Sequence, residues 1–344
     1  MESKKNIVFL YTELAEYFIS CVAKASTNTR LNILVIHWPI NKEAPFSFSF
    51  PENVQFIDKS KISRQVLFDT IVNFNPQTII SSGWIDKDYL KICSLYFHKC
   101  TTVLALDNSW NGSLKQKLLI FFSPLFLKKT FKKVWAPGTS QKKYAEKLSF
   151  KKENIFENFY APDISFYQSF SQKNTIPHVF LYVGRYVKHK GIFELWNAFI
   201  ELKKEYPNSW ELYCVGTGEE FENKLEHEDI KHFGFIQPKN LGEILTNSGV
   251  YILPSTFEPW GVVVHEMAAA GFPLLLSDAV GSKEIFLSQD NGFEFKPASK
   301  DAIKEAMKKI IQTSDEDLLK MSQKSVEYSK KITQEMWVDT LVKL

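Results

Sequence analysis

Short apolar runs alternate with longer polar or helical stretches along the whole chain. Runs of this length without charged residues are typical of strands that are buried on both faces of a parallel sheet. In the first half we expect strands at 6–11, 31–37, 54–57, 78–82, 101–106, 134–136 and 155–157. In the second half we expect strands at 179–183, 211–215, 250–253, 274–277 and 293–295. Strands that alternate with helices in this way predict an α/β fold.

The length of the chain predicts two domains. One hydrophobic core seldom serves a chain of 344 residues. The stretch 165–177 is polar and rich in serine and asparagine, so we interpret it as the linker. We therefore expect one domain at 1–170, a second at 171–325, and a C-terminal segment at 326–344. The last helix, 333–343 with Trp337, is expected to pack back on the first domain.

The stretch 249–281 carries the strongest chemical signal. A strand at 250–253 leads through a polar turn into a helix at 262–270, which is apolar nearly all round except for His265 and Glu266. Glu258 stands just before this helix, at the strand end where ligands of open α/β sheets bind. The helix N-terminus at Gly261 offers free N–H groups to a phosphate. Helical rise places the two glutamates roughly 10 Å apart, which suits the two ends of a nucleotide sugar.

A second group of candidate residues follows the strand at 179–183. Gly184 lets the backbone approach a ligand, and Arg185 and Lys190 are suited to binding phosphate. Arginine is rare in this chain, because only Arg30, Arg64 and Arg185 are present. A solvated basic turn is the alternative interpretation.

These motifs resemble the signature of the retaining glycosyltransferase family 4 (group 1), which has the GT-B fold. The likeness rests on Glu258-x7-Glu266 with its tail of small residues at 268–271, and on Gly184-Arg185-x4-Lys190-Gly191. It implies two Rossmann-like domains whose parallel sheets face a central cleft. By this resemblance Glu258 contacts the transferred sugar and Glu266 the ribose, while Arg185 and Lys190 bind the diphosphate. The implied donor-binding residues are Gly184, Arg185, Lys190, Gly216, Phe235, Ser255, Glu258, Pro259, Trp260, Gly261, Val262 and Glu266.

The first half departs from the family pattern. The turn at Thr12-Glu13 has no glycine, which disfavours dinucleotide binding and differs from the glycine-rich acceptor loop of many family members. Glu13 is a candidate acceptor contact, although a helix cap is an equal alternative. Asp107 stands where many family members have a histidine that faces the sugar. We treat Asp107 as a candidate catalytic residue, and Asp107 and Trp110 as candidate acceptor contacts; a plain loop turn is the alternative.

No metal or cofactor is expected. Asp86-Lys87-Asp88 precedes a helix, where a cap and a first-turn acid are favoured over a metal site. The four cysteines show neither zinc-site spacing nor a disulfide framework, which indicates a reducing compartment. The net charge of +3 is too small to indicate a nucleic-acid partner. The N-terminal stretch resembles no secretory leader, so we expect a cytoplasmic protein.

Residues 114–135 combine lysines with an aromatic and aliphatic centre. A segment of this kind can lie on an anionic membrane surface, which would suit a lipid-linked acceptor at the inner face of the plasma membrane. It can equally be a core helix with lysine-rich ends, or two helices broken at Pro124.

The expected function is transfer of a sugar, with retention and without metal, from a UDP- or GDP-linked donor to a hydroxyl group. The acceptor is expected to be a glycan or lipid-linked glycan in cell-surface polysaccharide synthesis, which would make the protein a glycosyltransferase of the EC 2.4 class. The alternatives are a nucleotide-sugar-binding scaffold subunit without turnover and a GT-B nucleotide-sugar epimerase.

Overall fold

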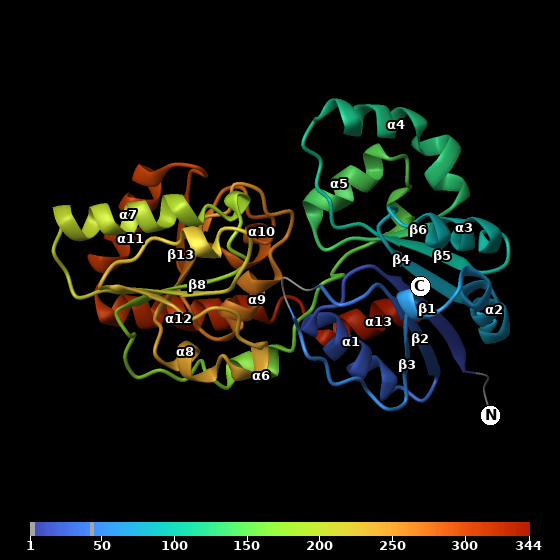
Figure 1. Cartoon of the computed structure of the whole chain (residues 1–344), viewed down its shortest axis with the longest axis horizontal. Helices are drawn as coiled ribbons and strands as arrows, with labels where there is room; N and C mark the ends of the chain where they lie inside the picture. Colours follow the sequence, from blue (N-terminus) through green and yellow to red (C-terminus); the bar gives the residue numbers. More distant parts are fainter. Residues whose placement is uncertain (1–3, 42–44) are drawn as a thin grey trace. The chain divides into compact units, whose positions relative to one another are not determined.

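The computed structural model describes residues 4–41 and 45–344, which form two compact units (Figure 1). Of these residues, unit 1 contains 4–41, 46–162 and 332–344, and unit 2 contains Pro45 and 163–331. The expected boundary at 170 therefore lies within unit 2. Unit 1 is discontinuous in sequence, because the chain returns to it after unit 2.

Unit 1 is built on a sheet in the order β3-β2-β1-β4-β5-β6-β7, and every pair of these strands is parallel. The chain moves outward from β1 to β3 and then returns to β4 on the other side of β1. The strands are β1 Lys5–Tyr11, β2 Leu31–His37, β3 Gln55–Asp58, β4 Thr78–Ser82, β5 Thr101–Ala105, β6 Lys133–Trp135 and β7 Ile155–Phe156. The helices are α1 Glu16–Ser26, α2 Arg64–Phe74, α3 Lys87–Tyr96, α4 Leu114–Phe126, α5 Thr139–Lys147 and α13 Gln334–Lys343.

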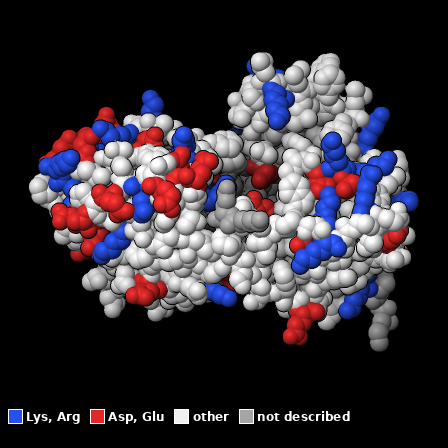
Figure 2. Space-filling model, viewed as in Figure 1, with Lys and Arg blue, Asp and Glu red and all other residues white. Residues whose placement is uncertain are grey.

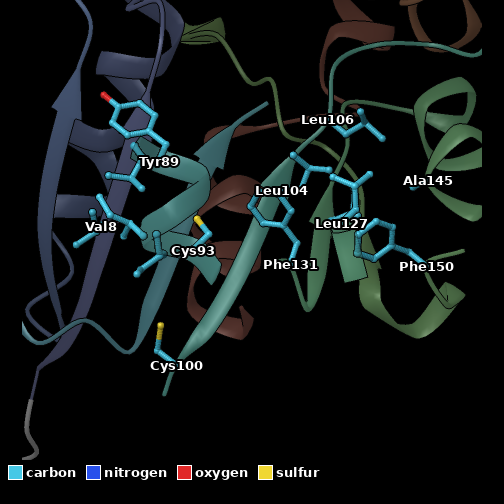
Figure 3. Close-up of a cluster of buried hydrophobic side chains, with 14 of the residues drawn as sticks. Val8, Tyr89, Cys93, Cys100, Leu104, Leu106, Leu127, Phe131, Ala145 and Phe150 are labelled. Atoms are coloured by element: carbon cyan, nitrogen blue, oxygen red, sulfur yellow. The ribbon is translucent and has the colours of Figure 1, made fainter. Parts of the chain in front are cut away.

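One face of this sheet packs against α2, α3 and α5. Alternate residues of β1, such as Val8 and Leu10, point into a core that also holds Tyr89 of α3 and Ala145 of α5 (Figure 3). Cys93 also lies in this core and is fully buried. Period-two alternation along a strand that is buried on both faces sends the intervening residues to the opposite side.

The opposite face of the sheet carries α1 and α13, which lie together in Figure 1. Phe9 of β1 packs edge-on against Phe18 of α1 and stacks with Trp337 of α13. Trp337 also lies 5.0 Å, between ring centroids, from Trp135 of β6, and its Nε1 donates to the carbonyl of Phe159 at 2.9 Å. The last helix of the chain is therefore part of the core of unit 1.

Unit 2 has a second parallel sheet, in the order β10-β9-β8-β11-β12-β13. Figure 1 shows α7 and α11 on one side of it and α6, α8 and α12 on the other. The strands are β8 Val179–Val183, β9 Glu211–Val215, β10 Ile230–His232, β11 Val250–Leu253, β12 Leu274–Ser277 and β13 Gly292–Phe295. The helices are α6 Ile164–Gln168, α7 Ile192–Glu205, α8 Gly242–Thr246, α9 Val262–Ala269, α10 Lys283–Phe286, α11 Lys300–Ile311 and α12 Asp315–Ser329.

Two local details differ from what the sequence pattern indicated. The predicted linker at 165–177 begins with the short helix α6, because the Asp163 carboxylate accepts from the backbone N–H groups of Ser165 and Phe166 and caps it. The predicted alternative of two helices broken at Pro124 is replaced by the single helix α4. Pro124 cannot donate to the carbonyl of Ile120, but the hydroxyl of Ser123 does so at 2.9 Å. None of the helices within 4–41 and 45–344 has the length and apolar character needed to cross a membrane.

Candidate active site

The order of strands in unit 2 explains why distant motifs meet. The chain starts at β8, proceeds to β9 on one side, and later returns to β11 on the other side of β8. Ligands of open α/β sheets bind at such a switch point, beyond the carboxyl ends of the strands. The Gly184–Arg185 turn follows β8, and the Ser255–Gly261 loop follows β11. The topology therefore brings the two predicted donor motifs to one edge of the sheet.

The turn after β8 is held tightly against its neighbours. The hydroxyl of Tyr182 donates to the carbonyl of Arg185 at 2.7 Å, and the backbone N–H of Gly184 donates to the carbonyl of Val215. Gly216, in the turn after β9, has φ +137°, and a Cβ there would lie 1.9 Å from the carbonyl oxygen of Gly184. Glycine is thus required at position 216 by a close approach between two backbones. The Arg185 side chain is exposed at this edge.

Lys190 and Glu258 form an ion pair at the centre of the edge. Both side chains are largely buried, with exposed fractions of 14% for Lys190 and 12% for Glu258. The hydroxyl of Ser255 donates to the same carboxylate oxygen of Glu258 at 3.3 Å. A buried charge needs such partners, because desolvation alone would strongly disfavour it.

The turn that carries Lys190 docks on the end of β11. Gly191 has φ +68°, and a Cβ there would lie 2.2 Å from the carbonyl oxygen of Pro254. The backbone N–H of Thr256 donates to the carbonyl of His189 at 2.8 Å. Burial lowers the pKa of His189, and the positive charges of Lys190 and Arg185 lower it further. This edge therefore favours anionic groups.

The loop from Glu258 to Gly261 is pinned to the segment that follows β12. The N–H of Gly281 donates to the carbonyl of Glu258, and the N–H of Ser282 to that of Trp260, both at 2.9 Å. Gly261 is the N-cap of α9 with φ +87°, so the first N–H groups of the helix begin beside Glu258. The Trp260 side chain is buried, which leaves only its backbone available to a ligand, whereas Pro259 is half-buried.

Glu266 lies in the second turn of α9 and is half-buried. Val262, the first residue of the helix, is also half-buried. Both motif glutamates affect the buried hydroxyl of Tyr251. Burial makes the largest contribution to the raised pKa of this hydroxyl, and the charges of Tyr182, Glu258 and Glu266 raise the pKa further. Both carboxylates therefore act on the same region of the β11 strand. Phe235, in the loop after β10, is half-buried.

His265, the other polar residue of α9, faces away from solvent and serves the packing of the helix. Its ring is fully buried, stacks on Phe286 at 4.2 Å between centroids, and bonds through Nε2 to the carbonyl of Ser329 at 2.7 Å. Because the carbonyl only accepts, Nε2 carries the proton, and burial lowers the pKa of His265 to about 4.

Unit 1 contains a pocket of about 320 Å³ at its own switch point, between β1 and β4. It is lined by residues that follow β1, β4 and β5, and by Phe159 and Tyr160 of the loop after β7. Thr12 and Ser82 join the first two of these strand ends, because the N–H of Thr12 donates to the Ser82 hydroxyl at 2.8 Å. This is the place where an open parallel sheet binds ligands.

Asp107 lies in this pocket beside a group of tyrosines. Its carboxylate accepts from the hydroxyl of Tyr160 at 3.4 Å and from the side-chain amide of Asn108 at 3.2 Å. The ring of Tyr160 packs edge-on against Tyr17 at 5.1 Å between centroids. The side chain of Asp107 is exposed. The surrounding pocket nevertheless desolvates its carboxyl group and raises its pKa, because desolvation outweighs the opposing effect of these hydrogen bonds.

The other predicted residues of unit 1 divide into two groups. Glu13 lines the pocket, is exposed, and accepts from the side-chain amide of Asn41 at 3.3 Å. Trp110 is not among the pocket-lining residues and instead packs against Tyr144 of α5, with Lys147 over its ring. The structure therefore separates Trp110 from the candidate acceptor site.

Asp86 caps α3, as predicted, by accepting from the backbone N–H groups of Asp88 and Tyr89. Its other oxygen pairs with Lys59, which also lies 3.2 Å from Asp88. Within the described ranges no three His, Cys, Asp or Glu side chains converge on a position that could hold a metal ion.

Sequence reasoning missed the tyrosines of the unit 1 pocket. Tyr11 and Tyr17 are separated from Tyr160 by most of unit 1, so spacing along the chain could not group them. The sequence did contain one signal, the end of the strand at 78–82. Ser82 ends β4, which lies beside β1, and Gly83 follows it. A switch point between these strands predicts a ligand site.

The comparisons with known proteins agree with this geometry. Residues 163–332, nearly all of unit 2, match the model of the family Glycosyl transferases group 1. An uncharacterized glycosyltransferase of Methanocaldococcus jannaschii is 28% identical over 138 residues, which are 38% of this chain and 35% of that protein. The capsular polysaccharide biosynthesis glycosyltransferase CapM of Staphylococcus aureus is 29% identical over 145 residues, 40% of this chain and 37% of CapM. The matched segments thus span about a third of the length of these relatives.

The whole chain resembles solved structures in fold. Anabaena HepE in complex with UDP and glucose superimposes with a TM-score of 0.72 at 16% sequence identity, over 99% of this chain and 100% of that one. The protein therefore has the GT-B fold, with two Rossmann-like domains that each contain a parallel sheet. Its residues 163–332 are similar in sequence to the group 1 glycosyl transferase family.

Proposed function

We propose that the protein is a retaining, metal-independent glycosyltransferase that moves a sugar from a nucleoside diphosphate sugar to a hydroxyl group. One observation carries the proposal. At the switch point of unit 2, the buried pair of Lys190 and Glu258 lies at the same sheet edge as the Gly184–Arg185 turn and the start of α9. Such an edge offers cations and free N–H groups to a diphosphate and a carboxylate to sugar hydroxyls.

The proposed role of Arg185, Lys190 and the α9 N-terminus is to stabilise the departing diphosphate. In the proposed complex these groups already surround the diphosphate, so they can oppose the charge that develops on the leaving oxygen. In the proposed complex the diphosphate replaces the Glu258 carboxylate as the partner of Lys190. The carboxylate is then released to accept hydrogen bonds from the sugar, while Glu266 binds the ribose hydroxyls.

The proposed chemistry takes place on one face of the sugar. The bond between the anomeric carbon and the diphosphate oxygen breaks, and the acceptor oxygen forms its bond to the same carbon from the same side. The acceptor proton passes to the leaving phosphate oxygen, so no enzymatic nucleophile is needed and the configuration is retained.

The proposed acceptor site is the pocket of unit 1, where Asp107 and Glu13 would accept hydrogen bonds from acceptor hydroxyls. We propose a glycan or lipid-linked glycan of the cell surface as acceptor, reached by a cytoplasmic protein in peripheral contact with the membrane through 114–135. The similarity to CapM, a capsular polysaccharide biosynthesis glycosyltransferase, supports a polysaccharide pathway. The UDP of the HepE complex favours a UDP-linked donor over a GDP-linked one.

The first experiment combines calorimetric binding of UDP, GDP and their sugars, with and without a chelator, with an assay of sugar transfer, for the wild type, two variants and one control variant. Arg185→Ala is expected to weaken nucleotide binding about 10- to 100-fold, because a hydrogen bond to a charged group is lost. Glu258→Gln is expected to retain UDP affinity and to lose about 10²–10³-fold in transfer rate. Glu305→Gln, at an exposed position of α11, is the matched control and should change neither quantity.

The same measurements distinguish the rivals. Nucleotide binding without turnover, for any acceptor tried, would replace the proposal by a scaffold subunit. A changed sugar produced from donor alone would indicate an epimerase. Undiminished transfer in Glu258→Gln would remove the role assigned to that carboxylate.

A further inference from the structure

Helix α4 exposes an apolar face that the fold of unit 1 does not use. Leu114 is 77% exposed, Phe121 76% and Leu125 66%, although large apolar side chains are usually covered. Three further side chains of the helix share this exposure, namely Leu118, Phe122 and Phe126.

These six side chains form one stripe. At about 100° per residue they fall within an arc of roughly 140° around the helix axis. Lys117 lies just outside one margin of this arc, and Lys115 lies at the other. Both lysines are exposed. We call the six apolar residues the outer face of α4.

The other side of the helix packs against unit 1, so the outer face is not exposed because the helix is detached from the core. Leu119 and Ile120 pack against the buried cluster. The hydroxyl of Ser123, which is fully buried, also reaches the carbonyl of Leu148 at 3.1 Å. Helix α4 therefore has two apolar sides, of which only one is used by the fold.

The charge around the outer face has a single sign. From 108 to 145 the sequence contains no aspartate or glutamate and eight lysines. Lys128 and Lys129, both exposed, follow the helix directly. On the face that Figure 2 shows, the surface over α4 is white and blue. A partner of this surface must therefore combine an apolar layer with negative charge.

We propose that the outer face of α4 inserts into the surface of an anionic lipid bilayer, with the flanking lysines on the lipid headgroups. An apolar stripe bordered by lysines is the arrangement of helices that lie in the membrane interface. The helix has 13 residues and is too short to cross a bilayer, so it lies in the interfacial plane. Resting on the proposed function, this surface assigns the acceptor to the lipid-linked class, since unit 1 holds both α4 and the acceptor pocket.

The test is flotation of the full chain with vesicles of phosphatidylcholine, with and without phosphatidylglycerol. The wild type is expected to bind the anionic vesicles and to lose binding in high salt. The double variant Phe121→Ser/Leu125→Ser should reduce the partition about tenfold or more, because each side chain gives up apolar burial in the lipid. Lys128→Gln/Lys129→Gln should reduce it on anionic vesicles alone.

Matched controls separate this surface from general effects. Val72→Ser removes an apolar side chain that is 62% exposed on α2, and Lys151→Gln/Lys152→Gln removes two exposed lysines elsewhere in unit 1. Both controls should bind vesicles as the wild type does, and circular dichroism should show every variant folded.

Two results would overturn the inference. The first is a wild type that does not bind anionic vesicles. The second is a Phe121→Ser/Leu125→Ser variant that binds these vesicles as strongly as the wild type does. A concentration-dependent dimer that this variant abolishes, without vesicle binding, would assign the face to a second copy of the chain instead. Calorimetry with UDP keeps the two proposals apart: UDP binding without vesicle binding refutes only the membrane face, and vesicle binding without UDP binding refutes only the proposed donor site.

Discussion

Asp107 differs from an ordinary surface aspartate, because its carboxyl shares a pocket with Tyr160 and Tyr17. Desolvation raises its pKa, so the carboxyl keeps its proton to a higher pH than in an unfolded chain. Its ionised form can accept a hydrogen bond from an acceptor hydroxyl, and its protonated form has lost part of that capacity.

We predict that the pH profile of transfer depends on Asp107. Activity should rise with pH as the carboxyl ionises, and the acid limb of kcat/KM should lie above the usual aspartate value of about 3.9. Asp107→Asn should abolish that limb and reduce transfer about 10- to 100-fold. An unchanged acid limb in Asp107→Asn would contradict the assignment.

The same variant has a stability signature of known sign. Because the pKa of Asp107 is raised on folding, its protonated form stabilises the folded state below the unfolded pKa, and this contribution is lost as pH rises through the folded pKa. Asp107→Asn should therefore raise the unfolding temperature at neutral pH and have less effect in acid. A lower unfolding temperature at neutral pH would count against a desolvated carboxylate.

At the scale of elements, buried strands were the most predictable part of the fold. The expected strands at 31–37, 78–82, 179–183 and 211–215 match β2, β4, β8 and β9 at both ends. Most residues of these strands are buried, so apolar residues dominate each run and its limits are clear. Strand β10 was not predicted as a strand, because it has three residues at the edge of its sheet and includes Lys231 and His232.

The donor side of the candidate site was more accessible to sequence reasoning than the acceptor side. Donor residues fall in two compact motifs, and the strand order brings those motifs to one edge. The proposed acceptor pocket is lined by residues of five separate segments, which only the folded unit brings together. Trp110 is close to Asp107 in sequence, but it does not line this pocket and packs on Tyr144 instead.

The turns after β9 and β10 allow a paired test of backbone approach. Gly216→Ala should destabilise unit 2 by on the order of 3 kcal/mol, because its Cβ would collide with the carbonyl of Gly184 at 1.9 Å. Gly234 also has a positive φ, of +68°, but nothing lies within 4 Å of a Cβ there. Gly234→Ala should therefore cost only about 1–2 kcal/mol. Chemical denaturation measures both values, and equal losses would contradict the role given to the close approach.

At the scale of the whole molecule, unit 1 depends on the last residues of the chain. Trp337 is buried among Phe9, Trp135 and Phe159, Gln334 donates to Ser20 of α1, and Glu335 pairs with Lys24. A fragment that ends at the close of β7 would keep α1 on this face of the sheet but would expose the part that α13 covers.

We predict that Trp337→Ala destabilises unit 1 by about 3–5 kcal/mol, as expected for removal of a fully buried large side chain. Met336→Ala, at a neighbouring position that is 38% exposed, should change stability by less than about 0.5 kcal/mol. Hydrogen exchange of β1 and β6 measures the effect locally. Equal protection in the two variants would mean that α13 adds little to the unit.

Because α13 is the last element of the chain, unit 1 cannot complete its fold on the ribosome until unit 2 has been synthesised. Nearly all of unit 2 lies in the segment 163–331. This segment is therefore synthesised after the last strand of unit 1 and before α13, which completes one face of that sheet. At ordinary rates of translation this interval lasts roughly 10 to 30 s. During that time the apolar surface around Phe9 and Trp135 awaits its partner, so the nascent chain is most exposed to chaperones and proteases in the half that is made first.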